Sequence, residues 1–233
     1  MRHDKTGAYH AVEALLRLHD DKYGFIGPDE FIPLAEQNGM IIAIGEFVFE
    51  EVCRMISARK IGQFGIERME INLSPAQCVQ KDLREVFKSI MDKYQIPYDM
   101  INLEITETAA VHSTEYLQQD MLAMNKDGIH FSLDDYGRGL SNVNYLVTFP
   151  FSIVKLDKEL VWAAEKQENA RVALRHIVKM MKELQLEIVA EGVETEAQVD
   201  MLREMDCDYM QGYLYAKPMP EDDFLSFIQA HQK

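Results

Sequence analysis

Cysteine, long apolar stretches and secretion signals are all scarce or missing in this 233-residue sequence. Cys53, Cys78 and Cys207 are far apart and form no CxxC pair, and their odd number rules out a complete disulfide framework. We therefore expect a reducing compartment and inert, buried thiols. No apolar run approaches the roughly 20 residues of a membrane span. The first ten residues, MRHDKTGAYH, lack the apolar core of a signal peptide. We predict a cytoplasmic domain, and leave open a sensor or membrane domain elsewhere in a longer protein.

Basic residues are also few, because 24 Lys and Arg stand against 39 Asp and Glu, which gives a formal net charge of −15. A protein that binds nucleic-acid polymers non-specifically needs a basic face, so this class is excluded. A small phosphate ligand is not excluded. Metal ions and one or two Arg or Lys can make a site locally positive whatever the global charge.

Several catalytic motifs are missing as well. The sequence has no GxSxG nucleophile elbow, and its seven histidines show no HExxH spacing. Gly137-x-Gly139 lacks the third glycine of a dinucleotide-binding fingerprint. These absences argue against a serine hydrolase of the α/β type, a zinc protease and a nucleotide-cofactor enzyme.

Short apolar segments alternate with helical patterns along the whole chain. We expect strands at 8–18, 70–74, 101–107, 130–135, 153–157, 187–191 and 208–212. We expect helices at 28–38, 44–59, 80–94, 114–127, 140–147, 168–184, 195–205 and 221–232. Alternation of this kind predicts an α/β fold with parallel βαβ units, and at least seven units in this length favour a (β/α)8 barrel. No linker or change in composition divides the chain, so we predict one domain over residues 1–233.

Polar side chains stand at the ends of these expected strands: Glu13, Asn72, Glu104, Asp134, Asp135, Lys155, Glu191 and Gln211. In a parallel barrel all strand C-termini open on one face, so these groups would converge. Each one alone is more often a solvated loop residue or a helix cap. That interpretation weakens when nearly every strand end carries such a group after an apolar run. Oxygen ligands of this kind suit Mg²⁺ or Mn²⁺ rather than structural zinc.

A series of short blocks then resembles one known family. The blocks are EALLR at 13–17, FIPLAE at 31–36, NLS at 72–74, LEITE at 103–107, DDYG at 134–137, VKLD at 154–157, AEGVE at 190–194, QGY at 211–213 and Pro218. In this order and spacing they resemble the EAL domain, the cyclic di-GMP phosphodiesterases of bacterial signalling. The resemblance covers the chain from about residue 4 to its end.

The resemblance implies a modified TIM barrel with two divalent ions, Mg²⁺ or Mn²⁺, that hydrolyses cyclic di-GMP to linear pGpG. It assigns Glu13, Asn72, Glu104 and Asp134 to one ion, and Asp134 with Asp135 to the other. Lys155, Glu191 and Gln211 would act on the attacking water. Arg17, Glu194 and Tyr213 would contact substrate, and Glu107 would anchor the loop after Asp135. The family resemblance also implies a homodimer.

Two departures from the family pattern leave alternatives open. The family's first strand has a Tyr-Gln-Pro-Ile-like sequence, whereas this chain begins with MRHDKTG. We therefore expect a barrel whose first strand is lacking or truncated, in a fragment of a longer signalling protein. The loop after the aspartates reads DDYGRGLSN, where Arg138, Leu140 and Asn142 replace the family's Thr, Tyr and Ser. The alternative functions are a catalytically weak or inactive cyclic di-GMP receptor and a protein-interaction module.

Overall fold

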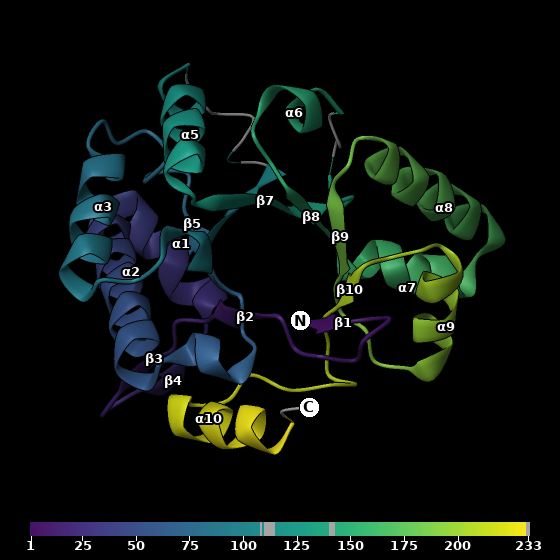
Figure 1. Ribbon diagram of the computed structural model, residues 1–233, viewed down its shortest axis with the longest axis horizontal. Helices are drawn as coiled ribbons and strands as arrows, with labels where there is room; N and C mark the ends of the chain where they lie inside the picture. The colour runs from purple at the N-terminus through teal and green to yellow at the C-terminus, as the bar shows by residue number, and fades with distance from the viewer. Residues whose placement is uncertain (108, 110–114, 140–142, 232–233) are drawn as a thin grey trace.

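Eight strands form a ring at the centre of the described part of the molecule, and helices surround the ring (Figure 1). This computed structural model describes residues 1–107, 109, 115–139 and 143–231. The strands are β1 (Arg2–His3), β2 (Ala11–Ala14), β5 (Arg68–Leu73), β6 (Ile101–Thr106), β7 (His130–Tyr136), β8 (Ile153–Leu156), β9 (Glu187–Ala190) and β10 (Tyr209–Met210). Their order in the sheet is β1-β10-β9-β8-β7-β6-β5-β2. All neighbours are parallel except β1, which runs antiparallel to β10.

The N-terminal segment nearly closes this ring. The Met1 amino group donates to the Ala11 carbonyl at 2.5 Å, and the His10 amide donates to the Met1 carbonyl at 3.1 Å. A bridge between Arg2 and Tyr9 continues this pairing. The first strand is only two residues long, as expected for a truncated strand. The prediction of a modified (β/α)8 barrel is confirmed.

The helices lie outside the ring and follow the expected order (Figure 1). They are α1 (Pro28–Asn38), α2 (Met40–Arg59), α3 (Leu83–Tyr94), α5 (Glu115–Asp127), α6 (Val143–Thr148), α7 (Lys158–Lys166), α8 (Glu168–Glu183), α9 (Glu196–Glu204) and α10 (Glu221–Ala230), with short 3₁₀ turns η1 (Ile61–Phe64) and η2 (Tyr98–Met100). The sequence analysis missed α7 and a separate hairpin of β3 (Leu18–Asp20) and β4 (Gly24–Ile26). It also began α2 too late, because Gly39, at φ +78°, ends α1 and starts α2 directly.

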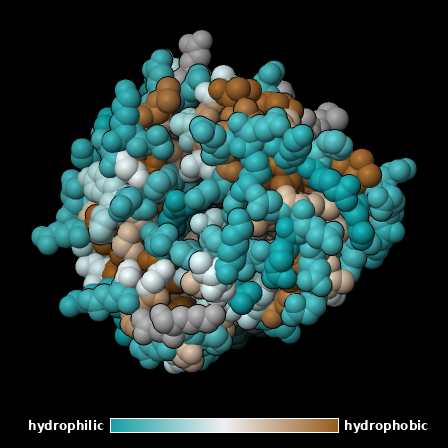
Figure 2. Space-filling view, turned by 45° about the vertical axis from the view of Figure 1, so that its right-hand side comes forward, coloured by the Kyte–Doolittle hydropathy of each residue, from teal (hydrophilic) through white to brown (hydrophobic). Residues whose placement is uncertain are grey.

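The core explains why these segments fold in this way. The ring strands are covered on both faces, and buried apolar residues such as Leu103 and Ile105 alternate along them with buried polar residues such as Asn102 and Glu104. In the outer layer, Phe49 of α2 stacks on Phe87 of α3 with ring centroids 3.9 Å apart. Hydrophilic side chains cover most of the face in Figure 2, and apolar patches interrupt them. Among the described helices none is long and apolar enough to cross a membrane.

Candidate active site

Parallel pairing brings the polar residues at the strand ends to one mouth of the barrel. In register, Asn72 of β5 lies opposite Glu104 of β6, and Thr106 of β6 lies opposite Asp134 of β7. The register between β7 and β8 shifts between Leu133 and Tyr136, so the two aspartates lie at an irregularity within β7. The mouth is therefore lined by consecutive strands of the ring, as in other parallel barrels.

Lys155 of β8 is the centre of this site. Its side chain is 1% exposed, and its Nζ lies 2.6 Å from Glu104 Oε1 and 2.9 Å from Glu191 Oε1. The same atom lies 3.6 Å from Glu13 Oε2 and 3.6 Å from Asp134 Oδ1. Burial lowers the pKa of Lys155, but these four carboxylates raise it well above its ordinary value. Lys155 is therefore a permanent cation in the metal-free site.

Glu13 of β2 is held by neutral donors as well as by Lys155. Asn72 Nδ2 donates to Glu13 Oε1 at 2.9 Å, and Gln211 Nε2 donates to Glu13 Oε2 at 2.7 Å. Burial acts to raise the pKa of Glu13, yet Lys155 and these two hydrogen bonds together lower it. The Glu13 carboxylate is consequently ionised and fixed in orientation.

The other carboxylates are poorly compensated. Burial is the largest cause that raises the pKa of Glu104 well above its ordinary range, and neighbouring carboxylates add to it despite Lys155. Burial and Asp135 raise the pKa of Asp134, against the attraction of Lys155. Burial and Asp134 raise the pKa of Glu191 to about 7, again against Lys155. The site thus holds more negative charge than Lys155 can balance.

These carboxylates fit a divalent cation. Within the described part of the chain, Glu104 Oε2 and Asp134 Oδ1 are buried oxygens without a hydrogen-bond partner. Asp134, Asp135 and Glu191 each offer an oxygen, and these three atoms lie within 4.8 Å of one another. Buried acceptors that lack donors are costly, and a hard cation satisfies them. The residues present therefore suit Mg²⁺ or Mn²⁺.

The backbone after β7 is a tight turn that aims the second aspartate at the site. Asp135 adopts φ +56° and Gly137 adopts φ +100°, both in the left-handed region. The positive φ favours glycine at position 137, and a Cβ there would lie 2.8 Å from Leu160 Cδ2, so the Leu160 side chain would have to shift. The Arg138 amide donates to the Asp135 carbonyl at 3.2 Å and closes the turn.

Comparison with known proteins agrees with this architecture. Residues 1–218 match the EAL domain family. The chain belongs to this family. It is 34% identical over 224 residues to the signaling protein YkoW of Bacillus subtilis, covering 96% of this chain and 27% of YkoW. It is 32% identical to the bifunctional diguanylate cyclase/cyclic di-GMP phosphodiesterase MucR of Pseudomonas aeruginosa, covering 96% of this chain and 33% of MucR.

Solved structures resemble this EAL domain closely. The c-di-GMP complex of the PaMucR phosphodiesterase superimposes with a TM-score of 0.89 at 32% identity, covering 96% of this chain and 90% of that chain. The EAL enzyme Bd1971 in its cAMP-bound form gives a TM-score of 0.90 at 25% identity, covering 97% of this chain and 64% of that chain. The chain spans only about a quarter to a third of the length of the curated relatives it matches.

The structure places the remaining predicted site residues of the EAL domain outside the acidic cluster. Arg17 is exposed, and its Nη1 donates to the Leu16 carbonyl at 2.9 Å. Glu194 and Tyr213 are also exposed, on the segments after β9 and β10. Glu107 is buried beside Tyr136, whose pKa is raised by burial and by Glu107. Leu140 and Asn142, in the loop that Glu107 was expected to anchor, lie outside the described residues.

A second polar layer lies beneath the site, and the sequence analysis missed it. Glu70, Asn102 and Ser132 are fully buried, and Asn102 Nδ2 donates to Ser132 Oγ at 2.9 Å and to Glu70 Oε1 at 3.4 Å. Each of them precedes a mouth residue by two positions on the same strand, and side chains two apart point to the same side. This two-residue spacing is the signal from which the buried polar layer could have been predicted.

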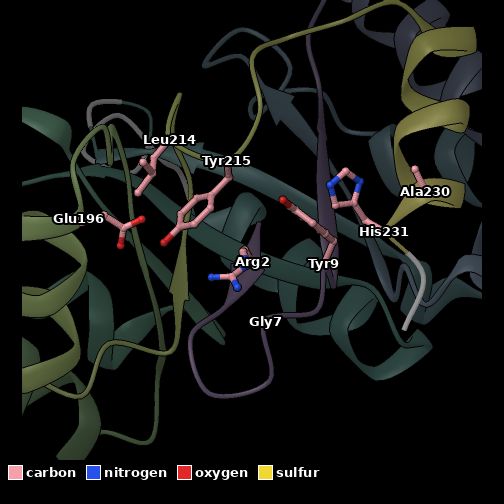
Figure 3. A pocket seen from close by; sticks show the side chains of 8 residues that line it. All are labelled: Arg2, Gly7, Tyr9, Glu196, Leu214, Tyr215, Ala230 and His231. Carbon is pink, nitrogen blue, oxygen red and sulfur yellow. The ribbon is translucent and has the colours of Figure 1, made fainter.

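A separate cavity of about 450 Å³ lies apart from the carboxylates of the candidate active site. Its lining includes Arg2, Tyr9 and Tyr215, with His231 at the end of α10 (Figure 3). Arg2 lies over the Tyr215 ring at 5.1 Å from the centroid. None of the predicted site residues lines this cavity.

Proposed function

We propose that this EAL domain hydrolyses cyclic di-GMP to linear pGpG with two divalent ions, Mg²⁺ or Mn²⁺. The observation that carries the proposal is the convergence of eight strand-end residues on one mouth with buried carboxylate oxygens left unpaired. The curated relatives named cyclic di-GMP phosphodiesterases support the same substrate. Activity, substrate and partners of a longer protein containing this chain belong to the same proposal.

The proposed roles follow from position and charge. Glu13, Asn72, Glu104, Asp134 and Asp135 would hold the ions, which when bound would lower the pKa of a water and withdraw charge from the phosphate. Arg17, an exposed planar cation three residues after the end of β2, would contact a substrate phosphate. Glu194 and Tyr213 would contact the rest of the substrate.

Three residues would act on the attacking water. Lys155 would orient it together with Gln211, and both residues contact Oε2 of Glu13. Glu191, whose pKa is about 7 in the metal-free site, would accept its proton or serve as a ligand. The water oxygen forms the new bond to phosphorus, and the bond from phosphorus to one ribose 3′ oxygen breaks. That oxygen takes up a proton, and the opened ring is pGpG.

The direct test is incubation of the purified protein with cyclic di-GMP and Mg²⁺ or Mn²⁺, followed by chromatography of the products. We expect pGpG with metal and none with EDTA. No pGpG with either metal overturns the enzyme proposal. Tight binding of cyclic di-GMP with Ca²⁺ in calorimetry, without turnover in Mg²⁺ or Mn²⁺, would favour the receptor alternative.

A variant separates chemistry from substrate binding. Asp135→Asn should reduce turnover far more than affinity for cyclic di-GMP, because Asp135 is proposed to act through an ion and not on the guanine bases. Equal losses in turnover and affinity would contradict this role.

Three further features remain proposals: a single domain over residues 1–233, a cytoplasmic location and a homodimer. Light scattering of the purified protein tests the last of these.

A further inference from the structure

The carboxylates of the site pair with two different cations, Lys155 and Arg138. Lys155 contacts Glu104, Glu191, Glu13 and Asp134 from inside the barrel. Asp135 is different, because its Oδ2 accepts from Arg138 Nη1 at 3.2 Å. In the described residues Asp135 makes no ion pair with Lys155 or another Lys or Arg. Arg138 is therefore the counter-ion of Asp135 in the metal-free protein.

The turn after β7 fixes this pair locally. The Arg138 amide is hydrogen-bonded to the Asp135 carbonyl, so the two side chains start from a closed turn. The guanidinium remains near solvent, since the Arg138 side chain is 65% exposed against 31% for Asp135. It can leave the carboxylate without disturbing the core.

The same carboxylate belongs to the candidate metal cluster. Asp135 lies with Asp134 and Glu191 in the group whose ligand atoms are within 4.8 Å of one another. A divalent cation at this cluster must share the Asp135 carboxylate with the guanidinium, or displace it. Both cations are positive, so they also repel each other at this distance.

We propose that Arg138 competes with a divalent cation for Asp135 and weakens metal binding at this end of the site. The inference rests on the proposed function, because it assumes that the acidic cluster is a metal site. Arg138 thereby sets the metal concentration at which the site fills. When metal binds, the guanidinium is released toward the open mouth.

The test is calorimetric titration of Mn²⁺ into the metal-free protein without nucleotide. Arg138→Met keeps an apolar stem and removes the charge, and it should tighten Mn²⁺ binding about two- to fivefold at low salt, the size of an exposed ion pair. High salt should shrink the gain, because it screens exposed charges. Arg138→Lys, which keeps the charge, should lie between Arg138→Met and the wild type.

Two controls isolate the pair. Arg175→Met removes one exposed positive charge on α8, so it changes the net charge equally and should leave Mn²⁺ affinity unchanged. In an Asp135→Asn background, Arg138→Met should no longer tighten binding, because the shared carboxylate is gone.

The outcomes are distinguishable from those of the hydrolysis test. Unchanged or weaker Mn²⁺ binding by Arg138→Met, or an equal gain in Arg175→Met, overturns the competition even if the wild type makes pGpG. No Mn²⁺ binding by the wild type overturns the competition, whereas the enzyme proposal is decided by the formation of pGpG with Mg²⁺ or Mn²⁺. A two- to fivefold gain confined to Arg138→Met supports the competition whether or not cyclic di-GMP is hydrolysed.

Discussion

Replacing Lys155 by methionine tests the charge balance of the site most directly. Methionine keeps much of the apolar stem but removes an ammonium that lies within 3.6 Å of four carboxylates. Those carboxylates would then face one another at a position that is 1% exposed in the wild type. Loss of one partner of a buried ion pair typically costs about 3–5 kcal/mol of unfolding free energy.

The pH dependence of this loss follows from Glu191. Its pKa is about 7 in the folded protein and 4.5 ordinarily, which means that ionised Glu191 already costs the metal-free fold about 3 kcal/mol. A raised acid pKa stabilises the fold at low pH, and this stability is lost as pH rises from about 4.5 to about 7. Without Lys155 the pKa of Glu191 rises further. The difference between variant and wild type should therefore be larger near pH 8 than near pH 5. The part that comes from Glu191 starts near pH 7 and grows by about 1.4 kcal/mol for each further pH unit.

Urea denaturation in EDTA at several pH values measures this difference. Lys179→Met is a matched control, since Lys179 is 73% exposed and lies 3.9 Å from Glu183, and it should change stability by less than about 0.5 kcal/mol. Mn²⁺ should restore part of the lost stability, because it neutralises the same carboxylates. A loss that is equal at all pH values, or no larger than that of Lys179→Met, would refute the reasoning.

Three further predictions address the carboxylates and the turn. In EDTA near pH 8, Glu104→Gln should lower the free energy of unfolding by less than about 3 kcal/mol, and so by less than Lys155→Met does, because Lys155 keeps its other three carboxylates. Mn²⁺ should then raise the melting temperature less than in the wild type. Gly137→Ala should lower stability by about 1–3 kcal/mol in urea, because φ is +100° and Leu160 occupies the space, whereas Gly139→Ala should cost little. The rise in melting temperature caused by Mn²⁺ should be larger near pH 8 than near pH 6, because protons compete with the ion for Glu191; an equal rise would contradict this.

The alternation of side chains along a strand explains how much of the site could be predicted from the sequence. A parallel barrel places the last inward residue of each strand at one mouth, so the strand-end positions could be assigned without coordinates. Asn72 and Glu104 indeed lie opposite each other in adjacent strands. The same alternation places Glu70 and Asn102, two residues before Asn72 and Glu104, on the inner side of the barrel. The sequence analysis overlooked them because it considered only the strand ends.

Other features have no comparable periodic signal. The α7 helix follows β8 after a single residue, and Asp157 caps it by accepting from the Glu159 amide at 2.8 Å. Its nine residues are too few for a clear apolar stripe. The contact of Arg138 with Asp135 depends on the left-handed conformation of Asp135, which a non-glycine residue rarely adopts. Asp135 followed by Gly137 does signal a sharp turn after the aspartates, but the sequence does not say which side chain the turn brings to Asp135.

The formal charge of the site bears on the proposal that it binds two ions. The five carboxylates Glu13, Glu104, Asp134, Asp135 and Glu191 face two cations, Lys155 and Arg138, which leaves a formal excess of three negative charges. One divalent ion would leave the site negative and repel a phosphodiester, whereas two would make it slightly positive. Affinity for cyclic di-GMP should therefore rise steeply only when metal is high enough to fill a second position. Calorimetry with Ca²⁺ at increasing concentration checks this expectation, and full substrate affinity with a single bound ion would contradict it.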